Sequence, residues 1–167
     1  MVKAASKVYK KFLASCPAPD APGSKQVTAL MTITGLIDAP KADKEFLSIN
    51  GAQGFSTFYG YYMLEAMAMA GNYQGALDVI REYWGAMIDL GATSFWEDFD
   101  INWIPNAAPI DELVPEGKKD IHGDCGAYCY VGFRHSLCHG WASGPTSWLS
   151  RHILGVEVIE PGCRQVR

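Results

Sequence analysis

Three acidic residues follow a tryptophan in one short loop, and their chemistry is the most specific in the chain. Glu97, Asp98 and Asp100 come directly after Trp96, in a stretch that begins at an expected helix end at Gly91. Aromatic faces stack on sugar rings, and a carboxylate can activate water or stabilise developing positive charge. Composition alone favours a solvated acidic loop here. The stretch therefore indicates either an acidic surface or a carbohydrate-cleaving site.

Cysteine and histidine residues further along the chain form a second candidate. His122, Cys125, Cys129 and His139 have spacings that permit a zinc site. The pattern is loose, because the second half of the site has no paired spacing, and buried structural cysteines explain it more simply. We therefore expect no metal and no other cofactor.

A histidine with aromatic neighbours is the third candidate. His139 follows Cys138 and lies two residues before Trp141. Such a histidine could contact a ligand, although composition alone favours a core histidine with satisfied hydrogen bonds. A Cys138–His139 nucleophilic pair is disfavoured, because adjacent residues on a helix point about 100° apart.

The composition is that of a globular protein and argues against two classes of partner. Of 167 residues, 49% are hydrophobic and 19% charged, with a formal net charge of −4. This charge argues against nucleic acid, which needs clustered Lys and Arg, and the lysines between Lys3 and Lys11 are expected on a solvated helix face. No apolar run approaches the ~20 residues that span a bilayer, so we expect no membrane partner. The five cysteines are expected to be mostly reduced.

Apolar periodicity predicts the helices that must position these residues. They are expected over residues 3–15, 24–37, 41–49, 56–70, 73–90, 136–142 and 146–154, with a short strand at 156–159. Ser24 and Asn72 are expected N-caps, and Gly71 and Gly91 expected helix ends. The helix over 56–70 is apolar nearly all round and the next is amphipathic, as inner and outer helices of a helical barrel would be. Periodicity is lost from 92 to 131, and so long a loop indicates function.

Four motifs in order resemble the bacterial α-L-rhamnosidases of glycoside hydrolase family 78. They are Gly91-Ala-Thr-Ser-Phe-Trp-Glu97, Ser136-Leu-Cys-His139 followed by Trp148-Leu149, Leu154-Gly155-Val156, and Glu160-Pro-Gly162 with its Arg-x-x-Arg tail. The likeness covers nearly the whole chain. It implies an all-α fold in which residues 1–155 are the C-terminal part of an (α/α)6 catalytic barrel. Residues 156–167 would then be the start of a link to a β-sandwich domain.

The resemblance also implies an activity and roles for three residues. The family inverts configuration, and by position Glu97 is the general base that activates water. His139 corresponds to a histidine near the sugar, and Trp96 would help to shape the pocket. The substrate would be a rhamnose-containing glycoside or polysaccharide. The family's general acid lies upstream of this stretch, so the chain alone is expected to be inactive.

Several departures from the family leave the exact glycoside open. Ser94 stands where Thr is common, Cys138 stands where Asn is common, and the loop between Glu97 and His139 is long. Two other functions remain open: a non-catalytic carbohydrate- or protein-binding helical domain, and a zinc-stabilised domain. The compartment is unknown, and is periplasmic or extracellular if the parent protein carries an upstream export signal.

If the chain is part of a barrel, we also expect it to associate with other copies of itself. Helices that have lost their barrel neighbours should expose apolar surface, and large apolar patches drive association. The helix over 56–70 has no polar side, so Tyr61, Tyr62, Met63 and Met67 are the expected exposed residues. We therefore expect self-association through an exposed barrel face.

Overall fold

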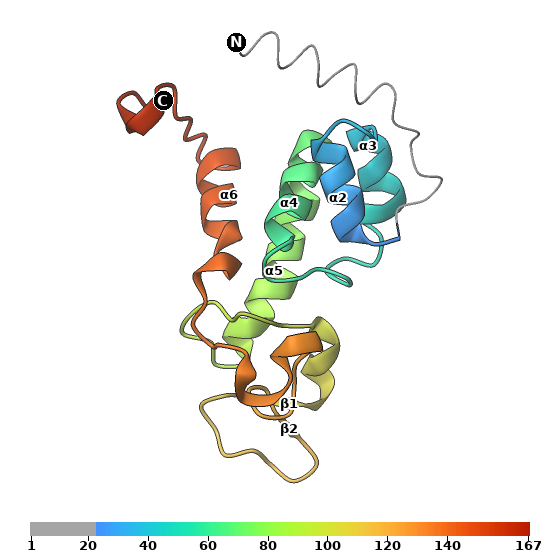
Figure 1. The fold of residues 1–167 in the computed structure, drawn as a ribbon, viewed down its shortest axis with the longest axis vertical. Coiled ribbons are helices and arrows are strands. Elements are labelled where there is room, and N and C mark those ends of the chain that lie inside the picture. The colour runs from blue at the N-terminus through green and yellow to red at the C-terminus, as the bar shows by residue number, and fades with distance from the viewer. Residues whose placement is uncertain (1–22) are drawn as a thin grey trace.

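The computed structural model describes residues 23–167, about half of which are helical with only two short strands, so the fold belongs to the mostly-α class (Figure 1). Its α-helices are α2 (Lys25–Ile33), α3 (Ala39–Ala42), α4 (Gly60–Met69), α5 (Tyr73–Asp89) and α6 (Gly144–His152), and a π-helical turn (Asp43–Leu47) continues α3. Short 3-10 turns span Ile101–Asn106, Tyr128–Tyr130, Gly132–Arg134, Gly140–Ala142 and Pro161–Cys163. In this part of the chain the only strands are β1 (Ala107–Ala108) and β2 (Lys119–Asp120), which pair in parallel. The helix expected over 3–15 lies outside the described residues.

The expected helix caps are confirmed at both N-termini where they were predicted. The Ser24 hydroxyl accepts a hydrogen bond from the Val27 N–H, and the Asn72 side chain accepts one from the Gly75 N–H. Helix α2 ends at Ile33 rather than near residue 37, because Gly35 adopts a left-handed φ of 80° that terminates the helix.

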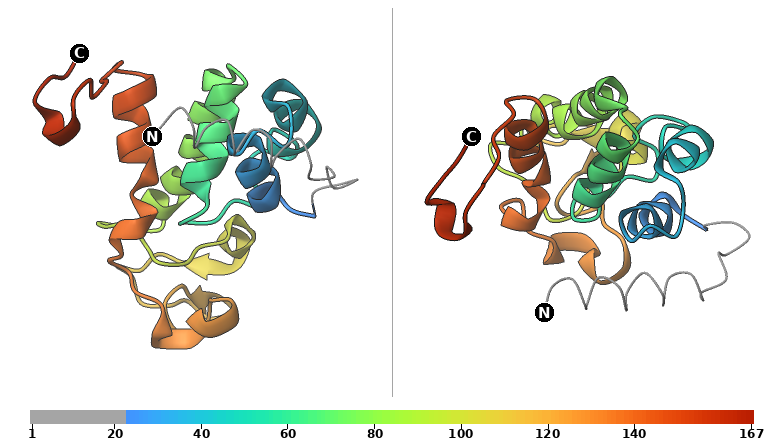
Figure 2. Two further views of the ribbon diagram at one scale, coloured as in Figure 1. Left: turned by 45° about the horizontal axis from the view of Figure 1, so that its top comes forward. Right: turned by 90° about the horizontal axis from the view of Figure 1, so that it is seen from above.

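Helix α4 occupies the centre of the helical part, which explains its apolar composition. It contacts α2, α5 and α6, and Figure 2 shows it enclosed between them when the molecule is seen from above. Met63 and Met67 are therefore buried, with 0% and 1% exposure. The expectation that these two methionines lie at the surface is wrong, whereas Tyr61 and Tyr62 are partly exposed. Self-association itself stays a prediction.

Three contacts hold helix α6 against α4. The buried Trp148 indole N–H donates to the Leu64 carbonyl at 3.0 Å. His152 Nε2 lies 2.9 Å from Glu65 Oε1, and both side chains are largely buried. Gly144 allows the close approach, because a Cβ there would lie 2.6 Å from Tyr61 Cβ.

The segment from residue 92 to 143 forms the other end of the molecule and has little regular structure (Figure 1). The helix expected over 136–142 is wrong: only the 3-10 turn Gly140–Ala142 forms. The reason is long-range pairing, since Glu97 N donates to Ser136 O and His139 N donates to Phe95 O. The strand expected at 156–159 is reduced to a single antiparallel bridge between Val158 and Val166.

The amphipathic helix α5 presents most of its predicted apolar residues to the core. Trp84 and Met87 are buried, but Ile88 is 69% exposed, contrary to expectation. Among the described residues, no helix is long and apolar enough to cross a membrane.

Candidate functional site

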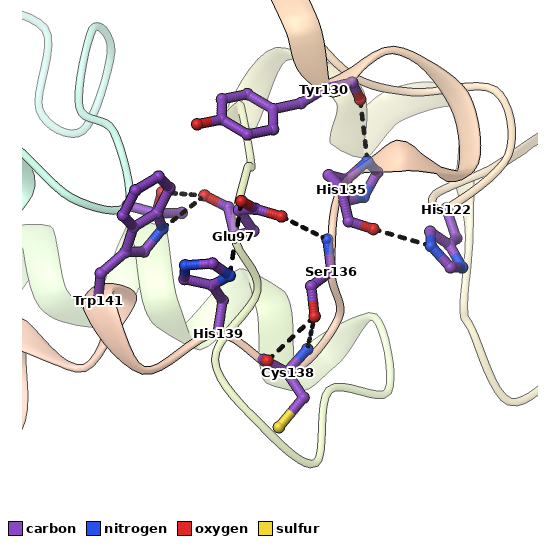
Figure 3. Close-up of polar contacts among 9 residues, drawn as sticks. Glu97, His122, Tyr130, His135, Ser136, Cys138, His139 and Trp141 are labelled. Atoms are coloured by element: carbon purple, nitrogen blue, oxygen red, sulfur yellow. Dashed lines mark hydrogen bonds and ion pairs between the residues drawn. The ribbon is translucent and has the colours of Figure 1, made fainter.

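Two loops that are distant in the sequence meet to form the candidate site (Figure 3). One follows α5 and carries Glu97, and the other carries Ser136 and His139. The Glu97 N–H donates to the Ser136 carbonyl at 2.8 Å, and the His139 N–H donates to the Phe95 carbonyl at 2.7 Å. Backbone pairing therefore brings together Glu97 and His139, two of the three residues that the family resemblance assigned to the site.

The Glu97 carboxylate has a different partner on each oxygen. Its Oε2 accepts a hydrogen bond from the Ser136 N–H at 2.8 Å, and its Oε1 lies 3.5 Å from His139 Nδ1. The Glu97 side chain is only 13% exposed and that of His139 is 32% exposed. The backbone bond anchors Oε2, while the longer contact leaves Oε1 able to accept a hydrogen bond from another donor.

The Glu97 carbonyl is held as firmly as its side chain. It accepts hydrogen bonds from the Trp141 indole N–H at 3.2 Å and from the Thr57 hydroxyl. The Trp141 ring also lies over His139, with ring centroids 4.3 Å apart. One residue along the chain, the Ala142 carbonyl accepts from the buried Trp84 indole of α5 at 3.0 Å. The core helix α5 thus fixes the turn that presents Trp141.

A cavity of about 450 Å³ opens beside Glu97. Its walls combine two carboxylates, several aromatic rings and small polar side chains. They come from α2, from the segment before α4 and from both site loops; the lining residues are Gln26, Ser56, Thr57, Phe58, Tyr59, Glu97, Asp98, Ala127, Tyr128, Tyr130 and Trp141. A concave site with aromatic walls and a few polar groups is typical of small-ligand pockets. Its size and chemistry suit a sugar ring.

Asp98 is a second carboxylate in the same cavity. Burial raises the pKa of the Asp98 carboxyl, and the hydrogen bond from the Ala127 N–H at 3.0 Å and the nearby His135 partly offset that rise. Sequence reasoning placed Asp98 in an acidic cluster and assigned it no role. Its position next to Glu97 was the only indication in the sequence, and that position does not reveal that both side chains border one cavity.

Trp96 does not line the cavity, and the role in shaping the site that the family resemblance implies for it stays a prediction. Its side chain is fully buried, packs edge-on against Phe99 and is absent from the cavity wall. The Trp96 indole N–H has no hydrogen-bond partner. Because its ring lies in the core, Trp96 cannot stack on a ligand in this cavity. The aromatic ring beside Glu97 is Trp141, which the sequence placed only two residues after His139.

The cysteine and histidine candidates do not converge. His122 Nε2 lies 2.9 Å from the His135 carbonyl oxygen, and His139 faces Glu97 instead. Burial raises the pKa of the Cys125 thiol, which disfavours its metal-binding thiolate form. Within residues 23–167, no group of three or more Cys, His, Asp or Glu side chains is placed to hold a metal ion. The zinc hypothesis therefore gains no support from the described residues.

Comparisons with protein-family models, with curated proteins and with solved structures find no match. The likeness to α-L-rhamnosidases consequently stays a hypothesis based on the motifs themselves. The function is best judged from the geometry around Glu97.

Proposed function

We propose that this chain supplies the general-base part of an inverting glycoside hydrolase that releases terminal α-L-rhamnose, with Glu97 as the base. One observation carries the proposal. The Glu97 carboxylate is anchored through Oε2, is mostly buried, and borders an aromatic-lined cavity large enough for a sugar. Helices α4 and α5, one enclosed and one amphipathic, would be an inner and outer pair of a partial (α/α)6 barrel.

The chemistry requires a water molecule between Glu97 and the sugar. Glu97 takes a proton from that water while the water oxygen attacks the anomeric carbon, on the face opposite the leaving group. The Ser136 N–H holds Oε2, which leaves Oε1 for the water. Inversion also needs a carboxylic acid roughly 6.5–9.5 Å away that protonates the leaving oxygen. We place that acid outside this chain, as the resemblance implies, and expect the isolated chain to be inactive.

The decisive experiment is Glu97→Gln in the full-length protein, assayed on an aryl α-L-rhamnoside. A glutamine carbonyl can still accept the Ser136 N–H, so the loops should keep their pairing, but a neutral amide cannot accept the proton of water. We expect turnover to fall by about 10²–10⁴-fold, the usual contribution of a general base. Circular dichroism should be unchanged.

Glu65→Gln is the matched control. Glu65 also faces a histidine, His152, and is 15% exposed, close to the value for Glu97, but it lies outside the cavity. This variant should retain turnover. Near-normal hydrolysis by the Glu97→Gln variant would contradict the proposal.

A non-catalytic carbohydrate- or protein-binding domain is the second candidate. One observation favours it. The Glu97 side chain joins two loops by accepting the Ser136 N–H, and this contact explains its burial without any catalytic role. On this alternative, the chain alone should bind a rhamnoside measurably in calorimetry. The full-length protein should not hydrolyse it.

A further inference from the structure

The Glu97 carbonyl is a junction between three parts of the chain. It belongs to the loop after α5, and it accepts hydrogen bonds from the Thr57 hydroxyl and the Trp141 indole N–H. Thr57 lies in the segment before α4, and Trp141 lies in the turn before α6. A carbonyl oxygen has two lone pairs, so it can satisfy both donors at once. These bonds tie the backbone of the candidate base to the segments that lead into both helices.

Thr57 is the donor whose hydroxyl serves Glu97 alone. Its side chain is buried, with 4% exposure, and its hydroxyl proton is used on the Glu97 carbonyl. Thr57 borders the cavity, but it has no proton left to donate to a ligand there. Trp141 is instead 39% exposed and its ring also lies over His139, so a change at Trp141 alters the cavity wall as well. A change at Thr57 therefore isolates the effect of the carbonyl bond.

The segment that carries Thr57 is itself held in place by its neighbours. Phe55 is buried in the core. The Ser56 hydroxyl accepts a hydrogen bond from the Gln26 side-chain amide of α2 at 3.3 Å, and the Ser56 carbonyl accepts one from the Gly60 N–H at the start of α4 at 2.8 Å. A hydroxyl presented from so constrained a backbone has a fixed position, and it can impose that position on its acceptor.

Glu97 is held by its N–H, by its carbonyl and by the end of its side chain. Its N–H donates to the Ser136 carbonyl at 2.8 Å, and its Oε2 accepts from the Ser136 N–H at 2.8 Å. The N–H and the carbonyl belong to successive peptide planes, which together fix the direction in which the side chain leaves Cα. Without the Thr57 bond, the second plane is freer to turn and to carry the carboxylate away from its place at the cavity.

We propose that Thr57 is a positioning residue for Glu97, because its hydroxyl fixes the backbone from which the carboxylate reaches the cavity. The inference rests on the proposed function and adds to it a residue that acts through Glu97 and not on the sugar. A general base must lie within hydrogen-bond distance of the water that it deprotonates. A misplacement of about 1 Å can cost about 10²-fold in rate, so a hydroxyl that prevents such a shift has a measurable effect.

Thr57→Val in the full-length protein, assayed on an aryl α-L-rhamnoside, tests the assignment. Valine is similar in shape to threonine, and the Trp141 indole still donates to the Glu97 carbonyl, so the fold should survive. We expect kcat to fall by about 10-fold, less than a full 1 Å misplacement would cost, with KM unchanged. Thr57→Ser keeps the hydroxyl and should have a kcat close to that of the unaltered protein.

Thr32→Val is the matched control. Thr32 is also a buried threonine, with 1% exposure, and its hydroxyl donates to a backbone carbonyl, that of Thr28, at 2.8 Å. It lies in α2 and does not line the Glu97 cavity. This variant should keep its kcat. An equal loss of kcat in the two valine variants would show a general effect of stability and would overturn the assignment.

Two other kinetic results would also overturn the positioning role. A raised KM with unchanged kcat in Thr57→Val would mean that Thr57 contacts the substrate, because such a change reports lost binding that is equal in the ground and transition states. A loss of kcat in Thr57→Ser as large as that in Thr57→Val would mean that packing of the threonine methyl group, and not the hydroxyl, supports turnover.

Hydrogen exchange at the Ser136 amide separates failure of the positioning role from failure of the proposed function. This amide donates to Glu97 Oε2, so its exchange reports the place of the carboxylate without any substrate. Exchange should be faster in Thr57→Val than in Thr57→Ser or Thr32→Val. If this pattern appears while Glu97→Gln keeps full turnover, the base assignment fails and Thr57 still positions the carboxylate. If exchange is the same in Thr57→Val and Thr32→Val, the positioning role fails whatever the role of Glu97.

Discussion

At the scale of single residues, the Glu97 side chain has a structural task and, on the proposed function, a chemical one. Its anchored oxygen joins two loops, and its other oxygen faces His139. The sequence named both residues as site candidates, but it did not show that pairing between residues 95–97 and 136–139 brings them together. The sequence does not show which of two adjacent side chains turns toward the core, and the structure places the Trp96 ring there.

Asp98 gives a residue-scale prediction about stability and pH. Burial raises the pKa of this carboxyl in the folded protein, so the folded state holds the proton more tightly than the unfolded state does. Ionised Asp98 therefore destabilises the fold at neutral pH, and this penalty disappears as the pH falls through the folded-state pKa toward the ordinary value of 3.8. An asparagine amide removes the charge and can still accept the Ala127 N–H.

We accordingly expect Asp98→Asn to raise the melting temperature at pH 7 by about 1 °C, a small change because solvent screens the half-exposed carboxylate. The difference should shrink in acid. Thermal melts of both proteins across this pH range provide the measurement. An increase in melting temperature that became larger at low pH would contradict the raised pKa of Asp98.

At the scale of elements, features that depend on nearby residues were predicted correctly from the sequence, whereas a feature that depends on distant contacts was not. Ser24 and Asn72 were predicted as caps because capping depends on neighbours within one helical turn. Residues 136–139 were misassigned to a helix because their non-helical form depends on pairing with residues 95–97, a contact that no local pattern records. The absence of α-helix from segment 92–131 was predicted correctly, since its prolines and glycines disfavour a continuous α-helix.

Gly126 gives a prediction for the loop that closes the cavity. Its φ of 142° lies outside the usual range for side chains with a Cβ, and an added Cβ would lie 2.1 Å from the Tyr130 carbonyl oxygen. Gly126→Ala should therefore force the loop to shift and cost about 1–3 kcal/mol of stability. The Ala127 N–H would move away from Asp98.

Urea denaturation measures that cost, and the amide signal of Ala127 reports the local shift. Gly117→Ala is a useful comparison, because Gly117 has a positive φ of 82° but nothing within 4 Å of an added Cβ. Gly117→Ala should therefore lose less unfolding free energy than Gly126→Ala. Equal stability of the two variants would mean that the contact with Tyr130 does not constrain the loop.

At the scale of the whole molecule, the irregular end owes its order to a few contacts with the helices. The Trp84 indole of α5 donates to the Ala142 carbonyl, and the Tyr83 hydroxyl of the same helix donates to the Phe99 carbonyl. Both bonds are buried, and both acceptors lie in the loops that carry the candidate site. Helix α5 therefore connects the helical core to Glu97.

Trp84→Phe tests this coupling. Phenylalanine keeps an aromatic ring but leaves the buried Ala142 carbonyl without its donor, at a cost of about 1–3 kcal/mol. Because stability is not uniform across a structure, the loss should be concentrated where the contact acts. Hydrogen exchange at the paired amides of Glu97, Ser136 and His139 should become faster than the change in global stability explains.

Trp148→Phe provides the matched comparison at the other end of the molecule. Trp148 is also a buried tryptophan whose indole donates to a carbonyl at 3.0 Å, but its partner is Leu64 of α4. This variant should lose a similar amount of stability without selective exchange at the Glu97, Ser136 and His139 amides. If the two variants give the same exchange pattern, the site loops are held independently of α5. A pattern confined to Trp84→Phe would identify α5 as the element that positions the candidate base.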